Sequence, residues 1–395
     1  MASDRSRIRV LFLPGWWYPT RYDPLSGVFV RRHAEAAARL CDVGVLFVHG
    51  VSALDRPLEL EPELAGGVPT IRAFYRRPEG RGVAARARDL LRYRRAAAIG
   101  LRAAVARFGV PHLHHVHVNP PAGLVRLVRR HRNRVPYVFT EHWSGYFPED
   151  GRYRGMLRTL LTRQLVRDAR CVTVVSGASQ RAMERAGLQG EYRVIPNAVD
   201  TDLFRPRSEG GPAGRDRATL VHVSNLDPSP KNPAGILRAI HGLAEQRADF
   251  RLLVVGDGPG RGAAERLAGE LGLLGGVVSF LGRREPAEVA EILAAADALV
   301  LFSDFENSPC VIGEAQACGL PVVASGVGGI PELVGEGFGE LVAAGDEADL
   351  QQVLGRLLDQ LPTYDRERIR RHAVDRYSYA SVGRAFLEVY EGALA

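Results

Sequence analysis

Residues 303–325 read Ser-Asp-Phe-Glu-Asn-Ser-Pro-Cys-Val-Ile-Gly-Glu-Ala-Gln-Ala-Cys-Gly-Leu-Pro-Val-Val-Ala-Ser, and this stretch decides the fold class. Polar loop residues come first, then a helical segment that ends at Gly319, then the apolar run Pro321–Ala324. Glycine is favoured just past a helix, and a short apolar run between turn signals is typical of a buried strand. A helix that leads into such a strand predicts an α/β fold with a parallel sheet.

The same alternation extends outward from this stretch in both directions. The expected strands are Arg9–Pro14, Val43–His49, His112–His117, Tyr137–Thr140, Cys171–Ser176, Thr219–Ser224, Arg251–Gly256, Val277–Leu281, Ala298–Leu301 and Pro321–Ala324. The expected helices are Val28–Leu40, Val83–Phe108, Ala122–His131, Met156–Asp168, Ala178–Ala186, Pro233–Glu245, Gly262–Leu271, Pro286–Ala295, Val311–Ala317, Asp349–Leu358 and Tyr379–Leu394. This order predicts doubly wound parallel sheets with helices on both faces.

One segment interrupts the alternation and divides the chain. Residues 205–217 are rich in glycine, proline and charge and contain almost nothing apolar, so they read as a linker. We therefore expect two Rossmann-like domains, residues 1–204 and 218–378, followed by a C-terminal helix in 379–395. Ligands of such sheets bind beyond the carboxyl ends of the strands, so the site is expected in a cleft where the two domains face each other.

Composition narrows the function classes. The 395 residues are 46% hydrophobic and 25% charged, and no apolar run approaches the ~18 residues that a membrane-spanning helix needs. Four cysteines without a CxxC pair predict neither a disulfide framework nor a zinc site, and the N-terminus shows no secretory signal pattern, so a cytoplasmic protein is expected. The net charge of the chain is +7. The arginine-rich first half is basic and the second half is acidic, so we expect the first half to bind an anionic partner.

The single lysine of the chain, Lys231, lies between an expected strand and an expected helix. Asn232 can cap that helix and Pro233 suits its first turn. A compact positive charge beside a helix N-terminus favours a phosphate group. Asn225 directly follows one expected strand, and Gly256 is the last residue of the next expected strand along the chain, so we assign both to the same site.

Two glutamates frame the opening stretch. Glu306 precedes a loop of small residues, and Glu314 lies in the helix that follows. Carboxylates accept hydrogen bonds from sugar hydroxyls, and the backbone near Ser308, Cys310 and Val311 offers N–H groups to an anion. This pattern predicts a site for a ligand that carries both hydroxyls and phosphate.

The first half contributes weaker signals. Gly27 directly precedes the expected helix Val28–Leu40, and a helix N-terminus favours an anion. His142 lies just after the expected strand Tyr137–Thr140, where it could bind a ligand or handle a proton. His115 and His117 share one face of a strand but lack a nearby aspartate or cysteine, so we predict no metal there. Asp200 and Asp202 spell a DxD pattern, which we interpret as turn and capping residues rather than metal ligands.

Together these motifs resemble the retaining glycosyltransferases of family 4, which have the GT-B fold, and the resemblance covers nearly the whole chain. It implies that Lys231 contacts the donor diphosphate, that Gly27 lies near the phosphates and that His142 lies near the transferred sugar. Glu306 would bind sugar hydroxyls and Glu314 the ribose. The turn Pro196-Asn197-Ala-Val-Asp200 also matches the family, and the C-terminal helix is expected to cross back to the first domain.

The chain departs from the family pattern at two places. Asn225 stands where many members carry an arginine, so Lys231 and backbone amides would carry more of the diphosphate charge. Asn307-Ser308-Pro309 replaces the family's Gly-Phe-Gly, so the donor sugar does not carry over.

The resulting hypothesis is a retaining, metal-independent hexosyltransferase. It would use a UDP- or GDP-sugar as co-substrate, without a further cofactor, and a glycan or lipid-linked acceptor, in cell-surface polysaccharide or glycolipid synthesis. A peripheral position at an anionic inner membrane face would suit the basic half. A nucleotide-sugar epimerase or a sugar phosphorylase is the alternative. A basic nucleic-acid-binding protein is a more remote one, because no recognisable binding motif or aromatic interleaving accompanies the arginines.

Overall fold

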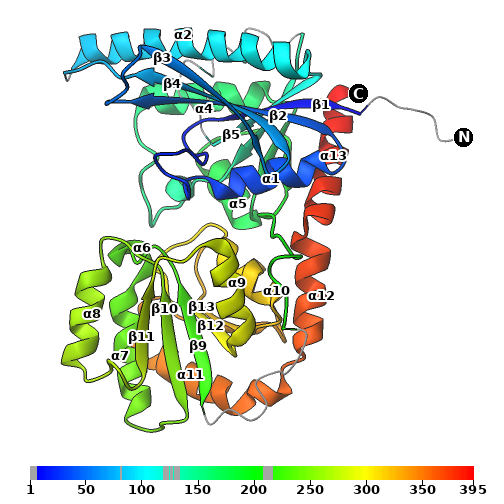
Figure 1. Cartoon of the computed structure of the whole chain (residues 1–395). Helices are drawn as coiled ribbons and strands as arrows, with labels where there is room; N and C mark the ends of the chain where they lie inside the picture. Colours follow the sequence, from blue (N-terminus) through cyan, green and yellow to red (C-terminus); the bar gives the residue numbers. More distant parts are fainter. Residues whose placement is uncertain (1–6, 81, 119–123, 125–127, 129–133, 208–216) are drawn as a thin grey trace, which may run out of the picture. The chain divides into compact units, whose positions relative to one another are not determined.

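The protein is described here as a computed structural model covering residues 7–80, 82–118, 124, 128, 134–207 and 217–395. The chain forms two compact units (Figure 1). The first contains residues 1–198 and 379–395, and the second contains residues 199–378.

An eight-stranded sheet forms the centre of the first unit, in the order β3-β4-β2-β1-β5-β6-β7-β8. Its strands are β1 (Arg9–Pro14), β2 (Asp42–Val51), β3 (Leu58–Ala65), β4 (Val68–Arg76), β5 (Leu113–His117), β6 (Tyr137–Glu141), β7 (Cys171–Val174) and β8 (Tyr192–Val194). Its helices are α1 (Val28–Ala38), α2 (Val83–Phe108), η1 (Ser144–Tyr146), α4 (Met156–Asp168), α5 (Gly177–Arg185) and α13 (Tyr379–Leu394). All described pairs are parallel except β3 with β4.

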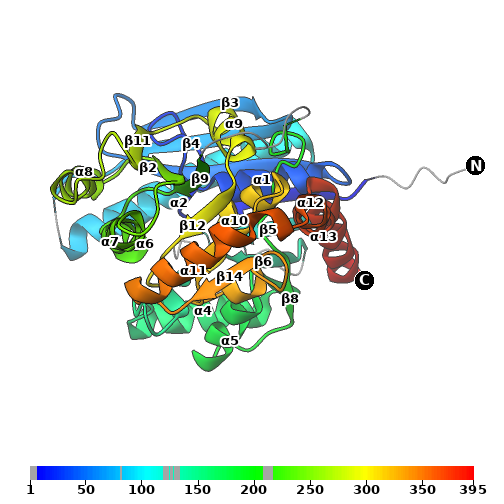
Figure 2. The ribbon, with the colours of Figure 1, turned by 90° about the horizontal axis from the view of Figure 1, so that it is seen from below.

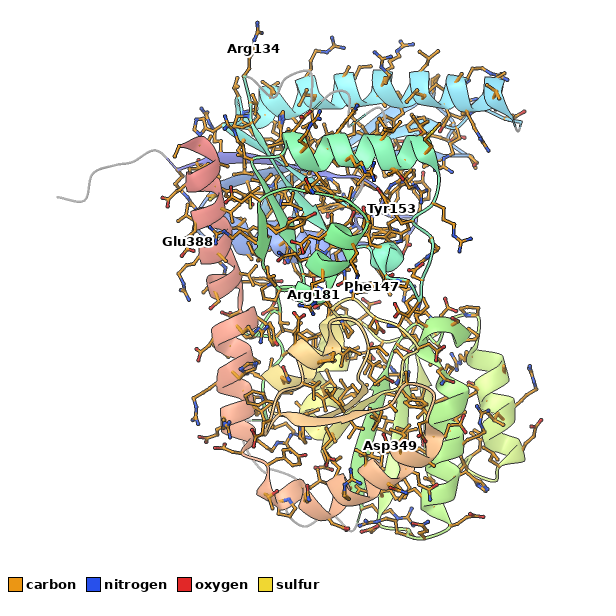
Figure 3. All side chains as sticks on the ribbon, turned by 180° about the vertical axis from the view of Figure 1, so that it is seen from behind. Arg134, Phe147, Tyr153, Arg181, Asp349 and Glu388 are labelled. Carbon is orange, nitrogen blue, oxygen red and sulfur yellow. The ribbon has the colours of Figure 1, made fainter. Side chains whose placement is uncertain are left out.

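Alternate residues of β1 supply the two cores of this unit. Leu11 and Leu13 join the core under α2 and α4, whereas Val10 and Phe12 join the core under α1 and α13. This is the two-residue period of a strand buried on both faces. Helix α13 lies against α1 (Figures 1 and 2), and Glu388 projects from its exposed side (Figure 3).

The second unit contains a six-stranded parallel sheet in the order β11-β10-β9-β12-β13-β14. Its strands are β9 (Ala218–Val223), β10 (Phe250–Val255), β11 (Val278–Gly282), β12 (Ala298–Leu301), β13 (Val322–Ser325) and β14 (Gly339–Val342). Its helices are α6 (Pro228–Lys231), α7 (Pro233–Ala244), α8 (Arg261–Glu270), α9 (Pro286–Ala295), α10 (Cys310–Ala317), η2 (Ile330–Glu332), α11 (Glu347–Gln360), η3 (Leu361–Thr363) and α12 (Arg366–Tyr377). Leu220 faces the core under α7 and α11, and Val221 faces the core under α9 and α10.

The α/β class and the parallel sheets that the sequence predicts are confirmed, although the prediction omits β8, β14 and α12 as well as a hairpin in the first unit. Residues 58–76 form an antiparallel β3–β4 hairpin that the strand prediction omitted. The signal was present, because alternating apolar residues flank Gly66-Gly67, and both glycines have positive φ as a tight hairpin turn requires. No described helix has the length and hydropathy needed to cross a membrane.

The contact division places the boundary earlier than residue 204. Residues 199–204 belong to the second unit, because Val199 and Phe204 are buried in its core and Arg370 bonds to the carbonyl oxygens of Thr201 and Phe204. Most of the expected linker, residues 208–216, lies outside the described residues, as does most of the helix expected at 122–131. Residues 379–395 belong to the first unit, with which α13 shares a core.

Candidate functional site

The candidate residues of the second unit gather where adjacent parallel strands end. The order β10-β9-β12-β13 places the loops after these four strands side by side at one edge of the sheet. The amide of Asp304, after β12, donates to the carbonyl of Pro230, in the short helix α6 that follows β9. Polar groups from different parts of the chain therefore meet at the carboxyl edge, as the sequence predicts for this fold.

Lys231 and Glu306 form an ion pair at this edge. The ammonium of Lys231, at the end of α6, donates to Oε1 of Glu306, which also accepts a hydrogen bond of 3.0 Å from Ser303 Oγ. The two side chains are only 18% and 11% exposed. Asn232 caps α7 through its side chain and Pro233 begins the helix, as expected. The structure thus joins two residues separated by 75 positions in the chain.

Three glycines allow the loops of this edge to touch. A Cβ atom on Gly256 would lie 1.7 Å from the carbonyl oxygen of Ser224, and one on Gly258 would lie 1.8 Å from that of Asn225. A Cβ on Gly328 would lie 1.7 Å from the carbonyl oxygen of Glu306. Because all three also have positive φ, a side chain is disfavoured on both counts. Gly256 therefore has a clear structural role in bringing the loops together.

The start of α10 lies at the same edge. Ser308, Cys310 and Val311 are half-buried, whereas Asn225 is exposed, and its side chain accepts from the Asp227 amide. Glu314 is 9% exposed, on the second turn of α10. All of these residues therefore keep some surface that a ligand could contact.

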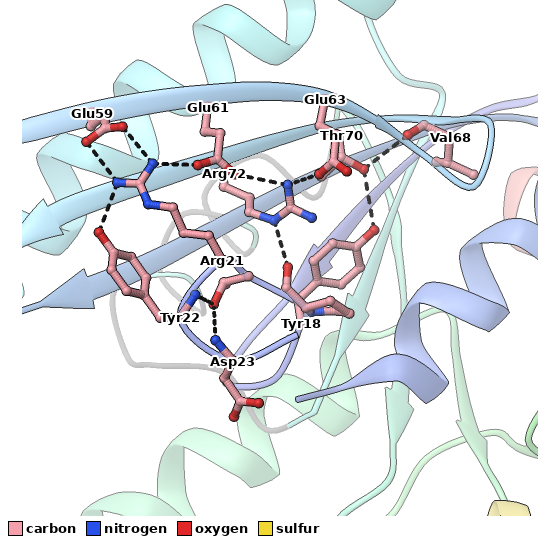
Figure 4. A network of polar contacts seen from close by, with 12 residues as sticks. Tyr18, Arg21, Tyr22, Asp23, Glu59, Glu61, Glu63, Val68, Thr70 and Arg72 are labelled. Carbon is pink, nitrogen blue, oxygen red and sulfur yellow. Dashed lines mark hydrogen bonds and ion pairs between the residues drawn. The ribbon is translucent and has the colours of Figure 1, made fainter. Parts of the chain in front are cut away.

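The loop between β1 and α1 is held by ionic contacts in the first unit (Figure 4). The Arg21 guanidinium bonds to Glu59 at 2.8 Å and to Glu61 at 2.6 Å, both on β3. Arg72 bonds to the carbonyl of Pro19 at 2.7 Å. The hairpin missing from the strand prediction therefore supports the loop that ends at Gly27.

Gly27 has φ of 66°, and a Cβ there would lie 2.4 Å from the Trp17 carbonyl. The close contact with Trp17 explains why this position is a glycine. The sequence had suggested a different reason, the close approach of a ligand. The residue still opens α1 without a side-chain cap.

His142 is positioned by a buried carboxylate that the sequence analysis missed. Glu141 Oε1 accepts from the amides of His142 and Trp143 at 2.8 and 3.0 Å, and its Oε2 accepts from the Tyr146 hydroxyl. Such bonds hold the segment after β6 rigid. A buried glutamate directly before the histidine was the available signal.

His142 belongs to a cluster of buried imidazoles. His117 Nδ1 lies 3.3 Å from His142 Nε2, and His115 bonds to the Tyr390 hydroxyl at 2.7 Å and to Thr140 Oγ1 at 2.5 Å. His33, from α1, completes the cluster, although the sequence analysis did not single it out. Burial lowers the pKa of His33 to about 4 and lowers the pKa values of His117 and His142 well below the usual range. All three rings are therefore neutral near pH 7.

The DxD pattern has the turn role expected of it. Asp200 Oδ1 accepts from the amides of Asp202 and Leu203 at 3.1 and 3.0 Å. Its carboxylate thus stabilises the turn that begins the second unit.

Two doubly wound units of this kind define the GT-B class of glycosyltransferase structures. The sucrose-phosphate synthase of Thermosynechococcus elongatus superposes with a TM-score of 0.74 at 21% identity, with 98% of each chain covered. Anabaena HepE in complex with UDP superposes with a TM-score of 0.71 at 20% identity, covering 97% of this chain and 100% of that one.

The chain belongs to the family 4 type of glycosyltransferases. Residues 8–203 match the model "Glycosyltransferase Family 4", and residues 217–360 match "Glycosyl transferases group 1". An MMP α-(1→4)-mannosyltransferase of Mycolicibacterium hassiacum is 36% identical over 66% of this chain, and a D-inositol 3-phosphate glycosyltransferase of Mycolicibacterium smegmatis is 30% identical over 69%. The matched regions span 60% and 66% of those relatives.

Proposed function

We propose that the protein is a retaining glycosyltransferase that moves a hexosyl unit from a UDP- or GDP-sugar to an acceptor hydroxyl. The Lys231–Glu306 pair carries the proposal, because it sets a cation and a carboxylate side by side at the ligand-binding edge of the second unit. A nucleotide sugar carries a diphosphate, which the cation can bind, and hydroxyl groups, which can donate to the carboxylate. Family membership and the structural similarity to HepE, solved in complex with UDP and with UDP-glucose, support the same substrate class.

In the proposed mechanism Lys231 stabilises the charge that develops on the departing diphosphate. Its ammonium has three N–H donors, so it can keep its bond to Glu306 and still reach a phosphate oxygen. Glu306 accepts from hydroxyls of the donor sugar, and Glu314 from the ribose. Asn225, Gly256 and the start of α10 complete the second unit's part of the proposed donor site.

His142 would bind the transferred sugar as a neutral imidazole. Since burial keeps its pKa low, the ring exchanges hydrogen bonds with a hydroxyl rather than adding positive charge. We assign no carboxylate as covalent nucleophile, so the acceptor would attack the face from which the diphosphate departs. Stereochemistry would then be retained without a covalent intermediate.

A screen of nucleotide sugars tests this function. We expect one UDP- or GDP-sugar to raise the unfolding temperature and to support transfer with retained anomeric configuration, read by NMR of the product. The transfer should survive EDTA. An acceptor-independent change of the sugar would indicate an epimerase, whereas phosphorolysis of a glycan would indicate a phosphorylase.

We further propose a lipid-linked or polyanionic acceptor at the inner face of the membrane. The arginines of α2 support this, because all of them are exposed, and Val83 and Leu91 are 84% and 63% exposed on the same helix. Each basic group near an anionic leaflet contributes roughly 1 kcal/mol.

Vesicle sedimentation tests this surface. We expect salt-sensitive binding to phosphatidylglycerol vesicles that weakens when Arg94 and Arg95 become Gln. The control changes Arg266 and Arg283, two exposed arginines of the second unit, to Gln and removes the same charge. Equal binding by both variants, or equal binding to neutral vesicles, would contradict the assignment to α2.

A further inference from the structure

Three imidazoles from three elements converge inside the first unit. His33 comes from α1, His117 from the end of β5 and His142 from the segment after β6. One nitrogen of each lies within 4.8 Å of the other two. Their ring centroids are 5.1, 5.5 and 5.9 Å apart.

These spacings approach those of a tetrahedral metal centre. Ligand nitrogens about 2.1 Å from a tetrahedral zinc ion lie about 3.4 Å from one another. His117 Nδ1 and His142 Nε2 are 3.3 Å apart, so this pair already has the required separation. The His33 ring needs a shift of about an ångström to join them.

One hydrogen bond orients the His33 ring for metal binding. A carbonyl oxygen only accepts, so the 3.1 Å contact between His33 Nε2 and the Pro196 carbonyl places the proton of that ring on Nε2. The lone pair is then on Nδ1, an atom that has no hydrogen-bond partner among the described residues. A bound ion would remove the free-energy penalty of burying the Nδ1 atom of His33 without a partner.

Neutral imidazoles bind a metal without first losing a proton. Burial provides this state, since it lowers the pKa values of all three rings. His115 differs from them, because both of its nitrogens are engaged by Tyr390 and Thr140. The donor set therefore contains three histidines rather than four.

We propose that His33, His117 and His142 bind one transition-metal ion, with zinc as the reference ion and a fourth position open to water. Imidazole ligands favour Zn²⁺, Ni²⁺ or Cu²⁺ over Mg²⁺ and Ca²⁺. His33 and His117 are fully buried whereas His142 is 9% exposed, so the ion enters from the side of His142. An ion held there competes with a sugar hydroxyl for that ring.

Direct binding to the untagged full chain, without donor or acceptor, tests this site independently of the transferase proposal. After chelation and dialysis, we expect calorimetry and metal analysis to show one Zn²⁺ per chain and no response to Mg²⁺. His33→Gln and His117→Gln should each weaken binding at least tenfold. His241→Gln, which removes an accessible histidine of the second unit, should leave binding unchanged.

Circular dichroism without metal checks that each variant is folded. No Zn²⁺ binding at micromolar concentration, or unchanged binding in both cluster variants, would overturn the proposal. If both variants unfold, Co²⁺ added to the wild-type chain decides. An intense tetrahedral visible spectrum supports the site, and the weak spectrum of six-coordinate Co²⁺ rules it out.

Discussion

Lys231 shows how one residue acquires a function from its surroundings. Lys231 is the single lysine in a chain whose remaining basic residues of this kind are all arginines. Its compact ammonium group reaches the Glu306 carboxylate. A planar guanidinium would spread its charge over a wider fork. The proposed role needs a point charge directed at one phosphate oxygen.

Replacing Lys231 with Ala should therefore slow transfer far more than it destabilises the fold. Loss of one preorganised charge contact typically costs ~3 kcal/mol in the transition state, or about 10²-fold in kcat. Steady-state kinetics and thermal unfolding measure the two effects separately. Arg238→Ala breaks the exposed pair with Glu347 in the same unit and serves as the control, which should retain full activity. A folded Lys231→Ala protein with wild-type turnover would refute the diphosphate role.

The buried histidines predict a loss of stability in mild acid. The folded-state pKa of His33 is about 4 and its ordinary value is 6.5, so the unfolded chain binds more protons between these values. Stability is then fully present above pH 6.5 and falls as the pH drops towards 4. One such histidine lowers the free energy of unfolding by about 2 kcal/mol when the pH falls from 7 to 5.

Urea unfolding at the two pH values measures this effect. Trp16, Trp17 and Trp143, the three tryptophans, all belong to the first unit, so their fluorescence reports on it alone. His33→Gln should flatten the pH dependence if it folds. An equal loss of stability at pH 5 in this variant and in the wild-type protein would show that His33 is not a source of the effect.

At the scale of elements, the binding edge of the second unit depends on loops that touch through glycine. Gly256→Ala should destabilise that unit by about 2 kcal/mol or more, because the new Cβ meets the Ser224 carbonyl in a backbone conformation that alanine disfavours. Thermal unfolding and nucleotide binding would both decline. Gly276→Ala is the control, since a Cβ there meets nothing within 4 Å. Equal effects of the two substitutions would contradict the close packing of the loops.

The same loops explain how far the sequence could predict the site. Local patterns identified the strand ends, the cap at Asn232 and the α10 helix, because each depends on neighbouring residues. The pairing of Lys231 with Glu306 depends on strand order, which local patterns do not specify. His33 was missed for a related reason, since a histidine within a helical pattern gains its partners only through tertiary packing. The β3–β4 hairpin has a local signal at Gly66-Gly67, so it is predictable from the sequence in a way that the Lys231–Glu306 pair is not.

At the scale of the whole molecule, the first unit is assembled from both ends of the chain. Residues 379–395 contribute Phe386 and Tyr390 to the core that also contains Val10 and Phe12 from the first strand. The Tyr390 hydroxyl bonds to His115 inside that core. The first unit therefore depends on the last helix of the sequence, and it cannot be completed without α13.

Phe386→Ala should consequently destabilise the first unit although the substitution lies near the C-terminus. Phe386 is fully buried and packs against His33 and His115, so its truncation leaves a cavity that typically costs 3–5 kcal/mol. Tryptophan fluorescence during urea unfolding should shift to lower denaturant. Leu394→Ala, at a 41% exposed position of the same helix, is the matched control and should shift it little. If Phe386→Ala left the tryptophan transition in place, α13 would not be an integral part of the first unit.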